Sequence, residues 1–106
     1  MKATVTLIVP CYNEEESLPF FYNAVYDVAR QLPDYGISLL LVNDGSKDGT
    51  LKVMRELAAR DERVQYLSFS RNFGKEAAMY AGFCNAKGDY VAVMDADMQD
   101  PPSLLP

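Results

Sequence analysis

The sequence contains no histidine and only two cysteines among its 106 residues. Without histidine, this segment cannot carry a histidine-based triad, a histidine general base or a zinc site of the HExxH kind. Cys11 and Cys84 lack the spacing of paired metal ligands, so we expect both to be small, buried, apolar side chains. No apolar run reaches the ~18–20 residues of a membrane span, and no basic region followed by an apolar one opens the chain, so we expect a soluble segment without a secretion signal.

The composition is that of an ordinary globular domain, with 49% hydrophobic and 24% charged residues. This balance argues against disorder and supplies enough apolar side chains for a core. At 106 residues the chain is one small domain or part of a larger one. Its formal net charge of −5 weighs against nucleic acid as a partner of the chain as a whole.

Two kinds of apolar pattern alternate along the chain. Short apolar runs rich in β-branched residues predict strands at residues 4–9, 37–42, 64–69 and 90–94. Between them, apolar residues at helical spacing predict helices within residues 18–32, 51–58 and 76–86. Because strands that are apolar almost throughout are buried on both faces, this order predicts an α/β fold, in which helices cover both faces of a parallel sheet.

The loops that follow the strands combine acidic, basic, amide and hydroxyl side chains, whereas those that follow the helices are short turns. The strands lead into "PCYNEEE", "NDGSKDGT", "SRNFGKE" and "DADMQDPP". The helices lead into "PDYG", "RDER" and "AKG". Since open parallel sheets bind their ligands at the carboxyl ends of the strands, we expect the four polar loops to converge on one site.

Several common phosphate and metal motifs are missing from these loops. No strand leads into G-x-G-x-x-G and no G-x-x-x-x-G-K-[ST] occurs, which argues against a dinucleotide site and a P-loop. The stretch "DGSKDG" resembles the start of an EF-hand loop, but Arg55 stands where that loop requires a bidentate glutamate.

What remains is a pair of aspartates at the end of the last predicted strand. Asp95 and Asp97 point the same way off a strand because they are two residues apart, and Gln99 adds a neutral oxygen. Such hard oxygen ligands suit Mg²⁺ or Mn²⁺. A metal held there would neutralise the aspartates and allow an acidic protein to bind an anionic diphosphate.

The four loop motifs, in this order and at this spacing, resemble those of glycosyltransferase family 2. They are most similar to the branch that transfers a sugar from a nucleotide to a polyprenyl phosphate, the dolichyl- or undecaprenyl-phosphate glycosyltransferases. The resemblance implies a GT-A type fold, with a Rossmann-like parallel sheet. It also implies that residues 1–106 are the nucleotide-sugar-binding part of a glycosyltransferase domain, truncated at the C-terminus before the acceptor-binding half.

The resemblance also assigns roles to individual residues. Pro10, Tyr12 and Glu14 match the segment that holds the base and ribose, and Asn43 or Asp44 matches the acid that reads the base edge. Arg71 and Lys75 match the basic loop near the nucleotide. The metal ligands implied are Asp95, Asp97 and Gln99, of which Asp95 also belongs to the substrate site. Asp100 and the prolines beside it fit the "DxQDPP" signature of that branch, in a structural role.

The implied reaction is an inverting transfer from a UDP- or GDP-linked sugar to an acceptor, which in the similar branch is a polyprenyl phosphate. An acceptor phosphate is largely ionised at neutral pH and needs no strong general base, and any such base would lie downstream of Pro106. This fragment alone is expected to be inactive. The full-length protein is expected at the cytoplasmic side of the cell membrane, with membrane contact through the missing C-terminal part.

Two other functions remain open from the sequence. A nucleotidyltransferase also uses a parallel sheet and paired aspartates, although its first loop is normally glycine-rich and basic, whereas "PCYNEEE" is acidic. A non-catalytic nucleotide-binding module is the other alternative. In each case, a sheet that lacks part of its covering helices would expose apolar surface, so we also expect self-association.

Overall fold

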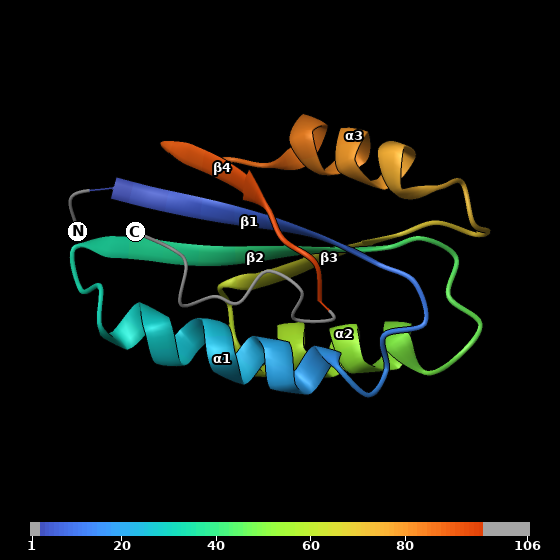
Figure 1. Cartoon of the computed structure of the whole chain (residues 1–106), viewed down its shortest axis with the longest axis horizontal. Helices are drawn as coiled ribbons and strands as arrows, with labels where there is room; N and C mark the ends of the chain where they lie inside the picture. Colours follow the sequence, from blue (N-terminus) through green and yellow to red (C-terminus); the bar gives the residue numbers. More distant parts are fainter. Residues whose placement is uncertain (1–2, 97–106) are drawn as a thin grey trace.

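The computed structural model describes residues 3–96, which form a four-stranded parallel sheet between two layers of helices (Figure 1). The elements follow one another as β1 (Ala3–Cys11), α1 (Leu18–Arg30), β2 (Tyr35–Asn43), α2 (Thr50–Arg60), β3 (Val64–Ser68), α3 (Lys75–Asn85) and β4 (Tyr90–Val93). The predicted parallel α/β fold is confirmed. The roles predicted for Asp97, Gln99 and Asp100 fall on residues outside the described range.

The strand order β3-β2-β1-β4 places the first strand in the interior of the sheet. Helices α1 and α2 cover one face, and α3 crosses the other face on its way from β3 to β4 (Figure 1). The chain therefore adds β2 and β3 on one side of β1 and then returns to add β4 on the other side, so the direction of strand addition changes between β1 and β4. In open α/β sheets the crevice at such a switch point is where ligands bind, because the loops on its two sides diverge.

Most of the core lies between the sheet and the α1/α2 layer. Its fully buried members include Leu7, Val9, Phe21, Leu41 and Met54. A smaller cluster lies under α3, where Ile8 of β1 meets Ala78. There α3 approaches the sheet so closely that a Cβ on Gly82 would lie 2.4 Å from Cγ2 of Ile8. Glycine at this position allows the Ala-rich helix to lie directly on β1.

Pro10 explains why β1 and β4 part before β1 ends. The backbone of Ile8 faces β4, since its carbonyl accepts the hydrogen bond of the Met94 amide at 3.0 Å. Two residues on, the backbone of Pro10 faces the same side but has no N–H to donate. The β1–β4 pairing accordingly ends at Ile8 opposite Val93, while β1 stays paired with β2 as far as Cys11 opposite Asn43.

Among residues 3–96, α3 and β4 expose several large apolar side chains. They include Tyr80, Phe83, Tyr90 and Val91.

The prediction that both cysteines are buried is correct for Cys11 and wrong for Cys84, which is exposed on α3 because this helix carries no clear apolar stripe. Within residues 3–96 no helix is both long enough and apolar enough to cross a membrane. Self-association stays a prediction.

A polar cluster joins α1 to the loop between α2 and β3, at the end of the sheet opposite the loops that follow the strands. It consists of Tyr22, Tyr26, Asp61 and Arg63. Asp61, which follows α2, accepts two hydrogen bonds from the Arg63 guanidinium, at 2.9 and 2.7 Å, and one from the Tyr22 hydroxyl of α1 at 2.7 Å. The guanidinium lies over the Tyr26 ring, 3.8 Å from its centroid. The Arg63 donors, helped by Tyr22, hold the pKa of Asp61 well below its usual range in spite of burial.

We predict that Asp61→Asn lowers the free energy of unfolding near neutral pH by about 1–2 kcal/mol, the size of a charged hydrogen bond to a partly exposed partner. Because the folded-state pKa of Asp61 is depressed, its contribution is complete above the unfolded pKa of about 3.9 and is lost as pH falls through the folded pKa. In urea unfolding, the gap between wild type and variant should therefore narrow below about pH 4.

Asp27→Asn is the matched control for this measurement. Its carboxylate pairs with Arg30 at 2.7 Å, but both side chains are largely exposed, so solvent screens the pair and stability should hardly change. A gap for Asp61→Asn that stays constant down to about pH 2 would contradict the role of its charge.

Candidate functional site

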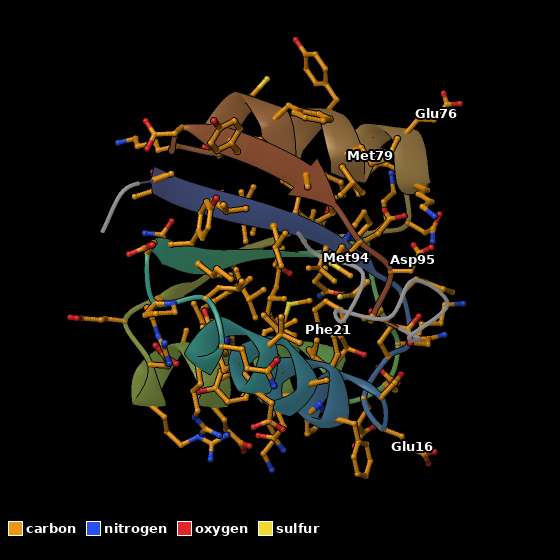
Figure 2. All side chains as sticks on the ribbon, turned by 60° about the vertical axis from the view of Figure 1, so that its left-hand side comes forward. Glu16, Phe21, Glu76, Met79, Met94 and Asp95 are labelled. Atoms are coloured by element: carbon orange, nitrogen blue, oxygen red, sulfur yellow. The ribbon has the colours of Figure 1, made fainter. Side chains whose placement is uncertain are left out.

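The loops after all four strands meet around one open pocket of about 230 Å³ at the carboxyl edge of the sheet. Its lining consists of Pro10, Cys11, Tyr12, Glu14, Asp44, Lys75 and Asp95. Every one of the four loops contributes at least one of these side chains. Figure 2 shows Asp95 just beyond β4 at this end of the molecule, while the exposed acids Glu16 and Glu76 point outward, away from it.

The first loop contributes an aromatic ring and a carboxylate. Tyr12 lines the pocket and is 40% exposed, so its side chain is accessible to a ligand. Glu14 accepts a hydrogen bond from the Ser17 hydroxyl at 2.7 Å, and its backbone N–H donates to the Thr50 hydroxyl at 2.8 Å. Ser17 thus orients Glu14 and makes no side-chain hydrogen bond to the start of α1.

The first and second loops are joined by reciprocal hydrogen bonds. Asn13, whose backbone φ is 54°, donates its N–H to the Ser46 hydroxyl at 2.9 Å, and its side-chain oxygen accepts the Lys47 N–H at 2.8 Å. Asparagine tolerates this left-handed conformation better than most residues. The turn of the first loop is therefore set by the second loop, and not only by its own sequence.

Two carboxylates extend this junction. Glu15 accepts the Gly49 N–H at 2.9 Å, and Asp48 accepts the Glu15 N–H at 3.3 Å. Asp48 also accepts both the N–H and the hydroxyl of Thr50, the first residue of α2. Burial disfavours the charge of Asp48, but these donors outweigh it and hold its pKa below the usual value. Acidic residues at such positions are typical helix caps, but the sequence alone does not show to which loop they bind.

Asn43 and Asp44, at the end of β2, are buried polar residues of the site. Both are almost fully buried, with exposed fractions of 3% and 4%. The Asn43 side chain donates to the Ser68 hydroxyl at 3.1 Å and accepts the Ser46 N–H at 3.0 Å. Asp44 accepts backbone N–H groups from the third loop and borders the pocket, whereas Asn43 does not line it.

The basic residues of the third loop occupy different positions. Lys75 lines the pocket, where its ammonium forms an ion pair with Asp95 at 2.8 Å. Arg71 does not line the pocket, and its guanidinium lies over the ring of Phe73, 4.7 Å from the centroid. The sequence alone does not distinguish the two cations, because it does not show that an aromatic ring lies beside one of them.

Cys11 at the pocket wall is no candidate nucleophile. Burial raises the pKa of its thiol far above the ordinary value, and the nearby Glu14 and Asp95 charges raise it further. Its Sγ–H donates to the Val9 carbonyl at 3.3 Å. The side chain therefore stays protonated and acts as a small buried apolar group.

The predicted metal site is described only at Asp95. Within residues 3–96 no group of three or more acidic, histidine or cysteine side chains is arranged to hold a metal ion. Asp95 nevertheless has the required chemistry: its carboxylate borders the pocket and already faces a cation, the Lys75 ammonium. A hard oxygen donor placed this way fits a divalent ion such as Mg²⁺ or Mn²⁺.

The parallel sheet and its strand-end pocket define the class of this protein, an α/β domain of the GT-A type. Residues 6–106 match the profile described as Glycosyl transferase family 2, and the chain therefore belongs to that family. A bactoprenol glucosyl transferase of Shigella phage SfV is 45% identical over 102 residues, which is 96% of this chain and 33% of the relative.

Two other proteins extend the comparison. The undecaprenyl-phosphate 4-deoxy-4-formamido-L-arabinose transferase of Pseudomonas fluorescens is 39% identical over 103 residues, 96% of this chain and 30% of the relative. A mannosyltransferase from Pyrobaculum calidifontis, solved in complex with GDP-Man and Mn²⁺, superimposes with a TM-score of 0.75 at 27% identity over 92% of this chain and 28% of that one. The chain thus spans about a third of the length of the curated relatives it matches.

We predict that Gly45→Ala separates the second loop from the third. Gly45 has a backbone φ of +69°, and a Cβ there would lie 2.1 Å from the backbone carbonyl carbon of Arg71. Strain and clash together should lower the free energy of unfolding by about 2–4 kcal/mol, because the obstructing atom belongs to the backbone and cannot rotate away.

Gly74→Ala is the control, since Gly74 also has a positive φ, of +99°, but a Cβ at this position would have no other atom within 4 Å. This variant should suffer the strain alone, about 1–2 kcal/mol. Equal losses for the two variants in urea unfolding would show that the contact between the loops adds nothing to stability.

Proposed function

We propose that this chain is the donor-binding part of a metal-dependent, inverting glycosyltransferase that transfers a sugar from a UDP- or GDP-linked donor to a polyprenyl phosphate. The observation that carries the proposal is the pocket at the switch point, where an aromatic ring, carboxylates and one ammonium group come from four different loops. Relatives named for bactoprenol and undecaprenyl-phosphate transfer support the acceptor, and the neighbour bound to GDP-Man supports the donor.

The pocket residues suit the parts of a nucleoside-diphosphate sugar. The accessible Tyr12 side chain can stack on a base, and Glu14, oriented by Ser17, can accept hydrogen bonds from ribose hydroxyls. Pro10 leaves an open space between β1 and β4 next to both. Lys75 offers a positive charge to the diphosphate, and Arg71 could do so after leaving the Phe73 ring.

Asp95, together with Asp97 and Gln99, would hold the Mg²⁺ or Mn²⁺ ion. When bound, such an ion supplies Lewis-acid stabilisation of the departing diphosphate. The chain's own contribution is to hold Asp95 beside the Lys75 ammonium, which offsets the Asp95 charge. Glu14 and Asp44 leave the lining acidic, so a bound cation would supply the positive charge that an anionic ligand needs. A polyprenyl phosphate acceptor is already anionic and requires no strong base.

We predict that full-length protein binds UDP or GDP roughly tenfold more tightly with Mn²⁺ than with EDTA, and that Asp97→Asn removes most of this difference. The substitution keeps the shape of the side chain but removes the charge that attracts the ion. Isothermal titration calorimetry measures both affinities. Glu76→Gln is the control, because it also removes a negative charge at this end of the molecule but from a side chain that points away from the pocket (Figure 2). Equal binding with and without metal in the wild type would refute the metal's role.

We also predict that residues 1–106 alone transfer no sugar, whereas the full-length protein does. Within residues 3–96 all four loops that follow the strands contribute to the donor pocket, so no strand-end loop of this range remains to hold an acceptor in line with the anomeric carbon. Such positioning accounts for ~7–11 kcal/mol of a barrier. The assay follows transfer from UDP- or GDP-sugars to a polyprenyl phosphate, which would occur at the cytoplasmic side of the membrane in the cell. Transfer by the short chain would mean that the acceptor site has been misplaced, and silence of the full-length protein would refute the proposed activity.

A further inference from the structure

Three consecutive backbone amides of the first loop are held by side chains of the second loop. The N–H groups of residues 13–15 donate, in chain order, to the Ser46 hydroxyl at 2.9 Å, the Thr50 hydroxyl at 2.8 Å and the Asp48 carboxylate at 3.3 Å. Backbone amides outside helices and strands must find acceptors elsewhere, and here one neighbouring loop supplies all three. These three side chains therefore set the path of the first loop just after β1.

The three acceptors stand at alternate positions of the stretch "SKDGT", residues 46–50. It is part of the stretch whose spacing resembles the start of an EF-hand loop, where oxygens at alternate positions surround a cation. In this structure the same oxygens face N–H donors of the first loop instead. The alternation thus matches the spacing of the amides that it binds.

Thr50 lies at the centre of this junction and is fully buried. Its hydroxyl accepts the Glu14 N–H and donates to the Asp48 carboxylate, so both hydrogen-bonding functions of the group are used. Thr50 is also the first residue of α2, and its own N–H donates to Asp48. One buried hydroxyl and its acidic partner therefore tie the first loop to the start of α2.

The backbone held in this way carries two side chains of the pocket. Tyr12 directly precedes the three amides, Glu14 carries the middle one, and both side chains line the pocket. The Ser17 hydroxyl orients the Glu14 carboxylate at 2.7 Å, but only relative to its own loop. The place of both side chains relative to the rest of the pocket depends on the second loop.

We propose that Ser46, Asp48 and Thr50 are positioning residues for nucleoside recognition. They fix the backbone from which Tyr12 and Glu14 extend, and so set the geometry in which these two side chains meet the base and the ribose. In the described part of the chain none of the three lines the pocket, so they act through the first loop and not by touching the ligand. The inference rests on the proposed function for its ligand, a nucleoside diphosphate.

The binding experiment uses full-length protein with Mn²⁺ and three ligands: UDP, GDP and inorganic pyrophosphate. Thr50→Val keeps the size of the side chain but removes the hydroxyl, which leaves the Glu14 N–H without its acceptor. The variant should bind UDP and GDP roughly tenfold more weakly. It should bind pyrophosphate as tightly as the wild type, because this ligand has no nucleoside to meet Tyr12 and Glu14. Thr50→Ser keeps the hydroxyl and should bind all three ligands like the wild type.

Thr6→Val is the matched control, since it makes the same change at another buried threonine. The Thr6 hydroxyl donates to the Lys87 carbonyl, and the residue does not line the pocket. This variant should bind all three ligands unchanged. A loss of UDP binding as large as that in Thr50→Val would mean that general destabilisation is responsible, and it would overturn the inference. An equal loss of UDP and pyrophosphate binding in Thr50→Val would overturn it too.

A second measurement needs no ligand. Hydrogen exchange at the Glu14 amide should be faster in Thr50→Val, and exchange at the Asn13 amide should be faster in Ser46→Ala, because each amide loses its acceptor. Thr6→Val should accelerate neither. Unchanged exchange at both amides in their respective variants would contradict the inference, whatever the ligand data.

The outcomes separate this inference from the proposed function. If the wild type binds neither UDP nor GDP, the proposed function fails, and the nucleoside role of the three side chains fails with it. If the wild type binds both and Thr50→Val binds them equally well, only this inference fails. If Thr50→Val does not fold, Ser46→Ala carries both measurements with the same expected difference between nucleotides and pyrophosphate, since Ser46 is only half-buried.

Discussion

Hydrogen bonds from backbone amides of one loop to side-chain carboxylates of a neighbouring loop hold the carboxyl edge of this sheet together. Glu15 and Asp48 join the first loop to the second, and Asp44 joins the second to the third. The ion pair of Lys75 with Asp95 continues the series to the end of β4. Because each bond links loops that follow different strands, no loop of the pocket takes its shape independently of its neighbours.

This arrangement also explains how an acidic chain can carry a site for an anionic ligand. Some of its acidic residues hold the loops together: Asp44, Glu15 and Asp48 already face backbone donors. Carboxylates bound in this way present less unpaired negative charge to the pocket than the net charge of −5 suggests. At the pocket itself the ammonium of Lys75 offsets Asp95, so the local field differs from that of the whole chain.

The sequence predicted the fold well because that prediction depends only on the spacing of the apolar residues and on the order of the strands and helices. Apolar runs separated by amphipathic helices specify parallel strands, and parallel strands bring the loops that follow them to one edge. It did not reveal how Asn43 and Asp44 are engaged or that Arg71 lies on Phe73, because these contacts depend on the register of neighbouring strands and on the loop conformations. Cys84 was misplaced for a related reason: α3 has small residues on its buried side and aromatic residues outside, so apolar spacing does not identify its inner face.

Pro10, on an interior strand of the sheet, helps to open the crevice that the strand order places between β1 and β4. Had β1 offered an N–H at residue 10, its pairing with β4 could have continued past Val93, and the crevice between the two strands would have been closed by backbone hydrogen bonds. Pro10 lacks that donor and the pairing ends at Val93; beyond it Asp95 pairs with Lys75. Pro10 thus lies where the pairing of β1 with β4 ends, and it also forms part of the pocket wall. The pocket therefore begins where the backbone hydrogen bonds between these two strands stop.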